Sequence, residues 1–500
     1  MNTNHKFAIQ RIKKEYVLQV QKKQLNKYIL LYRAIKQCIL KIELPDDWLL
    51  PSTRILSKEL GLSRTTVLKA YELLLLEKLI ISKTGSGNRI NYENSTNGGK
   101  DIVKQKLIDT NLYPKISRKG HSYLDNISLI NRLPNKNLAF RPGLPPLDAF
   151  PVNQWKKLLN TYWRHIKSSG LSYSQSTGLK ELKKSISNYL NISRNVKCKS
   201  EQIVIVSGSL QSLYLIATTL IDRGDAVVLE NPLFPNVHSV FKSSEANLIP
   251  IELDEEGISV KAMNAIPLDK KPKIVHVTPS NHYPSGVKMS LKRRQEVLQW
   301  ASENKALIIE NDYENEIANS TSSIPTIYSL DTEDRTIYMG TFNRLLHPSI
   351  RLGYMVVPKY LINAVEALQE HSHRFVSPSI QIVMNQFIEK NYLFQHIKNC
   401  IKVAKERHDL FISEFEAVSK TMYIQKKTFS SFHLLAYFKS PVSVEYEKDI
   451  IRKLNEHDIT TFSLSKCYIG TPKKQGLIIG YSSVRPTIMK RKIRKMGDFI

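Results

Sequence analysis

A serine, an arginine and two threonines follow one another where one predicted helix begins. Ser63 is a good N-cap for the stretch RTTVLKAYELLLLEK, so Arg64, Thr65 and Thr66 lie in its first turn. In a helix-turn-helix, the first residues of the second helix reach base edges in the major groove, and their free N–H groups favour phosphate. These residue types in this order therefore predict a surface that contacts duplex DNA.

Side chains on the neighbouring elements extend this candidate surface. Arg54 lies one turn into the preceding helix, where it could hold a phosphate or a guanine edge. One good bidentate contact to a base is worth roughly 1–3 kcal/mol of discrimination. For any single arginine a solvated polar face is the simpler explanation, whereas the assembled cap, turn, helix and basic hairpin favour DNA. The candidate DNA-binding residues are Ser52, Arg54, Ser63, Arg64, Thr65, Thr66, Lys69 and Arg89.

The stretch SGSLQSL joins a predicted strand to a predicted helix. The N–H groups around Ser209, Leu210 and Gln211 then face outward at a helix N-terminus, where a phosphate group is favoured. A motif of this kind is weak by itself, because an ordinary strand-to-helix turn has the same pattern. It is a candidate phosphate site that needs support from the rest of the chain.

Residues 24–91 are predicted to form the elements that position the first of these surfaces. An amphipathic helix covers about residues 24–41. Ser52 caps a second helix, which Gly61 ends, and the third helix starts after Ser63. Two helices joined by three residues that include a glycine form a helix-turn-helix candidate. The stretches LIISK and NRINY, joined by the turn TGSG, predict a two-stranded wing.

Beyond this region the pattern changes to short apolar strands that alternate with helical stretches. Residues 92–112 are rich in Asn, Gly, Ser and Lys and are predicted to be a linker. The alternation after them is typical of an α/β domain, and the long helices and strands after residue 359 predict a smaller α+β subdomain. The predicted fold is a helical winged-helix domain at residues 24–91 joined to an α/β domain at residues 113–500.

The charge of the chain agrees with a polyanionic partner. The 500 residues carry 73 Lys and Arg against 45 Asp and Glu, and residues 1–90 alone carry 17 against 7. The excess is therefore densest where the helix-turn-helix is predicted. The four cysteines have no paired spacing, so neither a zinc site nor a disulfide framework is indicated. Because we find no signal peptide and no apolar run of membrane length, we expect a cytoplasmic protein.

The stretch LPSTRILSKELGLSRTTVLKAYELLLLEKLIISKTGSGNRI resembles the winged helix-turn-helix of GntR-family transcription regulators. The resemblance implies binding to double-stranded operator DNA. The sequence departs from the family in the loop before the second helix, where Ile42 and Asp47 stand at positions that usually hold glycine. This departure should alter the loop and leave the third helix intact.

The remainder of the chain resembles fold-type-I pyridoxal phosphate aminotransferases, in the arrangement fused to such a DNA-binding domain, the MocR/GabR-type subfamily. The matching segments occur in the family order: FRPGLPPLDAFPVNQW, YSQSTGLKELKKSISNYL, IVSGSLQSL, ENPLFPNVHS, VTPSNHYPSG, IENDYENEI and GTFNRLLHPSIRLGYMVVP. The resemblance implies a fold-type-I α/β domain, pyridoxal 5′-phosphate as the cofactor, and a homodimer.

The same resemblance assigns roles to individual residues. Arg351 joins the SGSLQSL turn at the cofactor phosphate, and Phe234 stacks on the cofactor ring, although an aromatic residue before proline is often only a packing residue. Asn281, His282 and Tyr283 lie in the loop on the side of the ring hydroxyl. The candidate cofactor-binding residues are Ser209, Leu210, Gln211, Phe234, Asn311, Arg344 and Arg351.

Three positions depart from the aminotransferase pattern. The Schiff-base motif GTFSK reads GTFNR here, which places Arg344 at the lysine position; a guanidinium stays protonated and cannot form the internal aldimine. The carboxylate that pairs with the pyridinium nitrogen falls on Asn311, while Asp312 should point the other way unless the alignment slips by one residue. The position of the substrate-carboxylate arginine falls on Ile478.

We therefore expect a cytoplasmic transcription regulator whose aminotransferase-like domain is catalytically inactive and binds pyridoxal phosphate non-covalently at most. Arg344 and Arg351 could form a pocket for an anionic effector. Three alternatives stay open: a working aminotransferase fused to a DNA-binding domain, a regulator that senses pyridoxal phosphate or another phosphorylated or carboxylated metabolite, and a dimerising scaffold without a small ligand.

Overall fold

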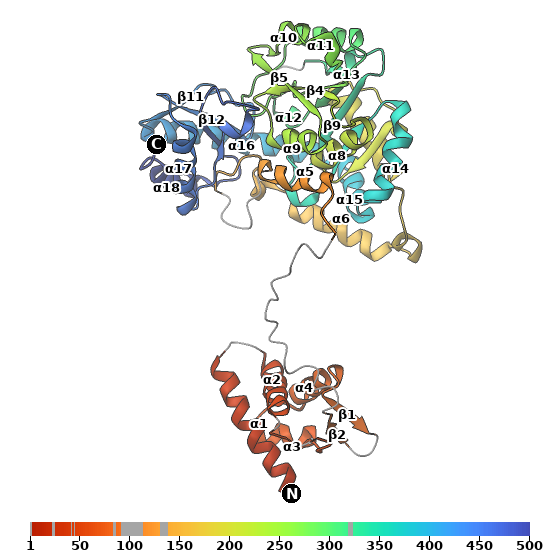
Figure 1. Cartoon of the computed structure of the whole chain (residues 1–500), viewed down its shortest axis with the longest axis vertical. Helices are drawn as coiled ribbons and strands as arrows, with labels where there is room; N and C mark the ends of the chain where they lie inside the picture. Colours follow the sequence, from red (N-terminus) through yellow and green to blue (C-terminus); the bar gives the residue numbers. More distant parts are fainter. Residues whose placement is uncertain are drawn as a thin grey trace. The chain divides into compact units, whose positions relative to one another are not determined.

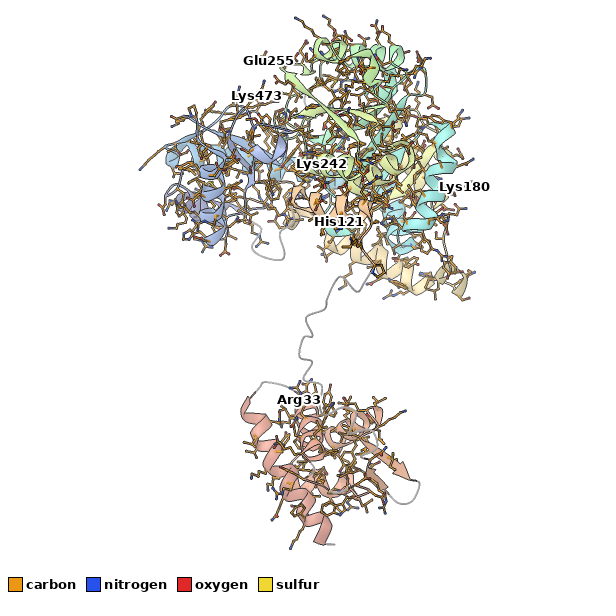
Figure 2. The ribbon with its side chains drawn as sticks, viewed as in Figure 1. Arg33, His121, Lys180, Lys242, Glu255 and Lys473 are labelled. Atoms are coloured by element: carbon orange, nitrogen blue, oxygen red, sulfur yellow. The ribbon has the colours of Figure 1, made fainter. Side chains whose placement is uncertain are left out.

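The computed structural model describes residues 3–22, 26–41, 43–44, 46–83, 87–91, 114–130, 139–318 and 324–500. The chain divides into two compact units, Met1–Lys115 and Ile116–Ile500 (Figure 1). The predicted linker at residues 92–112, Ile42 and most of the predicted turn of the wing lie outside the described residues. Charged side chains such as Lys242, Glu255 and Lys473 are exposed on the second unit (Figure 2).

The N-terminal unit is a helical domain with a two-stranded wing. Its elements are α1 (Thr3–Lys22), α2 (Lys27–Leu40), α3 (Thr53–Leu60), α4 (Arg64–Leu76), β1 (Ile80–Lys83) and β2 (Gly87–Ile90). The strands pair antiparallel, with Ile80 opposite Ile90. Gly61 ends α3 in the left-handed conformation at φ 63°, which costs little only for a residue without a Cβ. The helix-turn-helix and wing predicted from the sequence are therefore confirmed.

Helix α1 belongs to the same core, although sequence reasoning started this domain at residue 24. Ala8, Ile9 and Ile12 are buried with Leu31 and Ile35 of α2 in one apolar cluster. Spacing of three and four residues places the α1 side chains on one helix face. The N-terminal helix thus completes the core from which α3 and α4 project.

The larger unit is built on an eight-stranded sheet in the order β3-β10-β9-β8-β7-β4-β5-β6. The strands are β3 (Ile203–Val206), β4 (Ala226–Asn231), β5 (Asn247–Asp254), β6 (Gly257–Ile258), β7 (Ile274–Val277), β8 (Leu307–Asn311), β9 (Thr336–Thr341) and β10 (Gly353–Val356). Neighbours from β9 to β5 run parallel, whereas β10 and β6 are antiparallel to their neighbours.

Helices cover both faces of this sheet (Figure 1). Val204 and Val206 of β3 pack with α8 on one face, and Ile203 and Ile205 pack with α7 on the other, as the period of two in a strand requires. The helices are α5 (Arg118–Asn126), α6 (Val152–His165), α7 (Lys180–Arg194), α8 (Ser209–Leu220), α9 (Pro235–Ser243), α10 (Val260–Asn264), α11 (Leu291–Glu303), α12 (Asn315–Ala318), α13 (Ile327–Leu330), α14 (Ile362–Ser372) and α15 (Pro378–Glu389).

The C-terminal part forms the smaller α+β subdomain that the sequence predicts. Its four-stranded antiparallel sheet has the order β11-β12-β14-β13, and the long helix α16 leads into it. Its elements are α16 (Tyr392–Val418), β11 (Met422–Ile424), β12 (His433–Phe438), α17 (Val444–Glu456), β13 (Phe462–Ser463), β14 (Gly476–Gly480) and α18 (Pro486–Met496). Among the helices of the described ranges, none is long and apolar enough to cross a bilayer.

Four neighbouring parallel strands bring distant segments together at one edge. Phe234 follows β4, Tyr283 follows β7, Tyr313 follows β8 and Arg344 follows β9. In open α/β sheets the carboxyl ends of parallel strands form the crevice in which ligands bind. The fold therefore collects most of the predicted cofactor-binding residues at one place.

Candidate functional site

Ser63 organises the turn between α3 and α4. Its Oγ accepts a hydrogen bond from the Thr66 backbone N–H at 3.2 Å and lies 2.9 Å from the Thr65 hydroxyl oxygen. Ser52 caps α3 in the same way, because its Oγ accepts from the Ile55 N–H at 3.3 Å. The two predicted N-caps are confirmed, and the first turn of α4 is held in a fixed geometry.

The first turn of α4 presents Arg64 and Thr65 to solvent, and Arg54 of α3 is also exposed. Arg64 Nε donates to the Thr53 hydroxyl oxygen at 3.4 Å, a long contact between the two helices. Leu68, one turn further along α4, is 49% exposed. Sequence reasoning missed Leu68, although an exposed leucine four residues after Arg64 lies on the same helix face and could contact a thymine methyl group.

Two of the predicted DNA-binding residues already have partners within the unit. Arg89 Nη1 donates to the Asp47 carbonyl at 2.8 Å and to the Asp47 carboxylate at 3.1 Å. These hydrogen bonds join β2 to the segment between α2 and α3. Asp47 has φ 54°, a conformation that suits the glycine expected there. Lys69 Nζ lies 5.6 Å from the centroid of the Tyr28 ring. Arg89 and Lys69 therefore have structural contacts besides any contact with DNA.

A cavity of about 990 Å³ lies at the carboxyl ends of the parallel strands. It is lined by five of the seven candidate cofactor-binding residues, namely Ser209, Leu210, Phe234, Arg344 and Arg351. Asn311 and Gln211 are buried and are not among its lining residues. Arg141, Gly143 and Tyr283 also line it, and sequence reasoning gave Arg141 no role.

One end of the cavity is formed by the N-terminus of α8. Gly208 precedes this helix with φ 137°, and a Cβ added there would lie 2.5 Å from Asn343 Nδ2 and 4.0 Å from Arg351 Nη1. Gln211 is engaged elsewhere: its N–H donates to the Gly208 carbonyl at 3.0 Å, and its Oε1 accepts from the Ser207 N–H at 2.6 Å. The helix end, Ser209 and Arg351 together suit a phosphate group.

The side chain of Arg344 also lines the cavity and lies against two aromatic rings. Its guanidinium carbon is 5.8 Å from the Phe234 ring centroid and 5.4 Å from the Tyr313 ring centroid. Its Nη1 is 3.5 Å from Glu314 Oε1, an ion pair that is too long and misaligned for a good hydrogen bond. A Cβ on Gly143 would meet Arg344 Nη1 at 1.8 Å, and the φ of 82° at Gly143 is a conformation that favours glycine.

Several buried polar atoms in the segments that follow β7 and β8 have no hydrogen-bond partner among the described residues. Among them are the hydroxyls of Tyr283 and Tyr313 and both amide atoms of Asn281. Burial raises the pKa values of both tyrosines well above their usual range, so the hydroxyls stay protonated and can donate. Because buried polar groups are normally paired, these atoms indicate a place for a polar ligand.

Asp312 forms a buried ion pair, and neither of its two residues lines the cavity. Its Oδ2 accepts from Arg194 Nε of α7 at 2.8 Å and from the Tyr338 hydroxyl at 2.6 Å. The Arg194 side chain is 2% exposed and that of Asp312 is fully buried. Asp312 is thus already paired with an arginine, and it is not among the residues that line the cavity.

Ile478 is fully buried in β14, in an apolar cluster with Tyr283 and Tyr313. No guanidinium of this strand can therefore reach a substrate carboxylate.

The residues fit one part of pyridoxal phosphate and do not fit another. The α8 end suits its phosphate, and the unpaired tyrosine hydroxyls suit its ring hydroxyl. Arg344 cannot condense with its aldehyde, and the neutral Asn311 cannot hold a ring nitrogen protonated by charge. No catalytic step can therefore be derived through the cofactor at this site.

Glu230 of β4 is buried, and burial raises its pKa to about 8. Its Oε2 accepts from the Thr278 N–H at 3.0 Å, while Oε1 has no partner among the described residues. The carboxyl is protonated in the folded state below this pKa, whereas the unfolded chain ionises near pH 4.5. Unfolding between these values releases a proton, so this group's contribution to stability is lost as the pH rises towards 8.

We therefore expect Glu230→Gln to match the wild-type stability at pH 5 and to exceed it at pH 8 by about 3 kcal/mol. Denaturant unfolding at both pH values measures the difference. Glu255→Gln, at an exposed position, is the control and should change neither value. Equal pH slopes for Glu230→Gln and the wild type would contradict the assignment.

Comparison with known proteins identifies both units. Residues 142–473 match the family Aminotransferase class I and II, and residues 27–90 match the bacterial regulatory proteins of the gntR family. The probable rhizopine catabolism regulatory protein MocR of Rhizobium meliloti is 28% identical over 467 residues, which cover 93% of this chain and 92% of the relative. The pyridoxine biosynthesis transcriptional regulator PdxR of Corynebacterium glutamicum is 24% identical over 451 residues, 90% of this chain and 91% of the relative.

Solved structures show the same fold for the larger unit. The kynurenine aminotransferase of Pyrococcus horikoshii superimposes with a TM-score of 0.66 at 23% identity, covering 80% of this chain and 98% of that chain.

Proposed function

Because this chain belongs to the class I and II aminotransferase family and joins that domain to a gntR-type helix-turn-helix, we propose that it is a transcription regulator whose aminotransferase-like domain is catalytically inactive. The observation that carries the inactivity is Arg344, which extends into the cavity where the resemblance calls for an amine that can condense with an aldehyde. Two relatives that match at least 90% of this chain are named a regulatory protein and a transcriptional regulator, which supports the regulatory role.

DNA recognition on this proposal uses the first turn of α4. Ser63 fixes this turn, Arg64 and Thr65 reach base edges in the major groove, and Arg54 contacts the backbone or a base. Such a regulator acts in the cytoplasm, where its operator lies. We further propose a homodimer, since two helix-turn-helix units read paired half-sites.

The larger domain is proposed to sense an anionic metabolite. Any pyridoxal phosphate there is held without a covalent bond to residue 344: its phosphate lies at the α8 end with Arg351, and its ring competes with Arg344 for the face of Phe234. The names of the relatives link them to rhizopine catabolism and to pyridoxine biosynthesis, which supports control by a small molecule in this chain too.

Arg64→Ala should weaken binding to the specific duplex by roughly 1–3 kcal/mol if this arginine reads a base. Fluorescence anisotropy on the selected operator fragment and on a shuffled fragment, at one salt concentration, measures the change. Lys78→Ala, two residues after the end of α4, removes the same charge away from the first turn and should have little effect.

Equal weakening on both duplexes would make Arg64 a phosphate contact instead. If the wild-type protein shows no preference among genomic fragments at moderate salt, the regulator proposal is wrong.

A further inference from the structure

The cavity of the larger unit carries uncompensated positive charge. Among its described lining residues three are arginines, Arg141, Arg344 and Arg351, and none is acidic. Glu314 lies behind the lining and offsets Arg344 at 3.5 Å, whereas Arg141 and Arg351 have no carboxylate within ion-pair distance among the described residues. Burial and the charge of Arg344 lower the pKa of Arg141. The cavity therefore favours a ligand with at least two negative charges.

The positive groups of the cavity form two sets, which we call its two ends. At one end, Arg351 Nη2 is 3.4 Å from the Ser207 hydroxyl beside the N-terminus of α8, whose first N–H groups favour a phosphate. At the other end, Arg344 packs over Gly143, two residues after Arg141. The forked donors of a guanidinium match a planar carboxylate.

Arg344 lies where a planar cofactor ring would stack. Its guanidinium is within cation–π distance of Phe234 and Tyr313, so it already covers the aromatic surface. The unpaired hydroxyl of Tyr283, a residue that is 2% exposed and lines the cavity, remains available to a ligand oxygen. An acyclic ligand can use both charged ends without displacing Arg344 from the rings.

We propose that this cavity binds a small acyclic phosphorylated carboxylate, with its phosphate at the α8 N-terminus and Arg351 and its carboxylate on Arg344 and Arg141. This proposal rests on the proposed function, because it names the chemical class of the effector that the regulator would bind. Pyridoxal phosphate binds less well, because its ring and the Arg344 guanidinium require the same space.

Calorimetric titration of the full-length protein at fixed ionic strength tests this with four probes: inorganic phosphate, succinate, 3-phosphoglycerate and pyridoxal phosphate. We expect 3-phosphoglycerate to bind at least about tenfold more tightly than any of the others, because only it presents a charged group to each end without a ring. Tighter binding of pyridoxal phosphate or of succinate overturns the proposal, and so does the absence of binding by every probe.

Variants separate the two ends. Arg344→Gln and Arg141→Gln should each reduce the affinity for 3-phosphoglycerate roughly tenfold and leave that for phosphate unchanged, whereas Arg351→Gln should weaken both. Arg223→Gln, an exposed arginine outside the cavity, is the matched control. Unchanged 3-phosphoglycerate affinity in both Arg344→Gln and Arg141→Gln overturns the proposal.

The operator titration on the same preparations distinguishes this inference from the proposed function. A protein that selects its duplex but binds no probe refutes the effector class alone. One that binds 3-phosphoglycerate and selects no duplex refutes the regulator.

Discussion

Arg344→Lys combined with Asn311→Asp should turn a protein that stays colourless with pyridoxal phosphate into one with a visible aldimine absorption band. Lysine supplies an amine that can lose its proton and condense with the aldehyde, and aspartate supplies a charge for the ring nitrogen. The shorter, unbranched lysine head also frees the faces of Phe234 and Tyr313, against which the guanidinium lies at 5.8 and 5.4 Å. The measurement is an absorption spectrum before and after cofactor addition.

Borohydride reduction followed by peptide mass analysis provides the covalent readout. The variant should carry a pyridoxyl group on residue 344, and the wild type none on the segment 336–351. The matched control is Arg351→Lys, which changes an arginine of the same cavity to lysine outside the Schiff-base position. A reducible adduct in the wild type would contradict the proposed inactivity, and a double variant that stays colourless would favour a scaffold without a ligand.

Asp312→Ala should destabilise the larger unit by about 3–5 kcal/mol, since it leaves the Arg194 guanidinium buried without a counter-charge. The Arg194 side chain is 2% exposed, and its other hydrogen bond, from Nη2 to the Ser280 hydroxyl at 2.9 Å, is to a neutral group. The loss also removes an acceptor from Tyr338. Urea unfolding, monitored by tryptophan fluorescence, measures the effect, because three of the four tryptophans lie in this unit.

Asp449→Ala is the control, because Asp449 pairs with Arg452 at 2.6 Å on the exposed face of α17. Exposed pairs contribute little, so its unfolding transition should stay at the wild-type position. A small effect of Asp312→Ala would mean that water or a rearranged carboxylate reaches Arg194, and Asp312 would again be a candidate partner for a ligand in the cavity.

Features that depend on neighbouring residues could be predicted from the sequence. Ser52, Gly61 and Ser63 end or begin helices through hydrogen bonds and backbone conformations within a few residues, so the helix-turn-helix followed from local signals. The alternation of strands and helices likewise predicted the α/β class. The identity of residue 344, and with it the loss of an amine, needs no structure at all.

Tertiary structure decided which contacts each of these side chains makes. The sequence could not show that α1 completes the N-terminal core, that Arg194 of α7 neutralises Asp312, or that Glu314 faces Arg344. These contacts join residues far apart in the chain, and their partners depend on how elements pack and not on spacing along one element. The sequence by itself determined which charged groups are present. Only the tertiary structure, which packs Arg344 over Gly143 and against Phe234, decided where the positive charge of Arg344 lies.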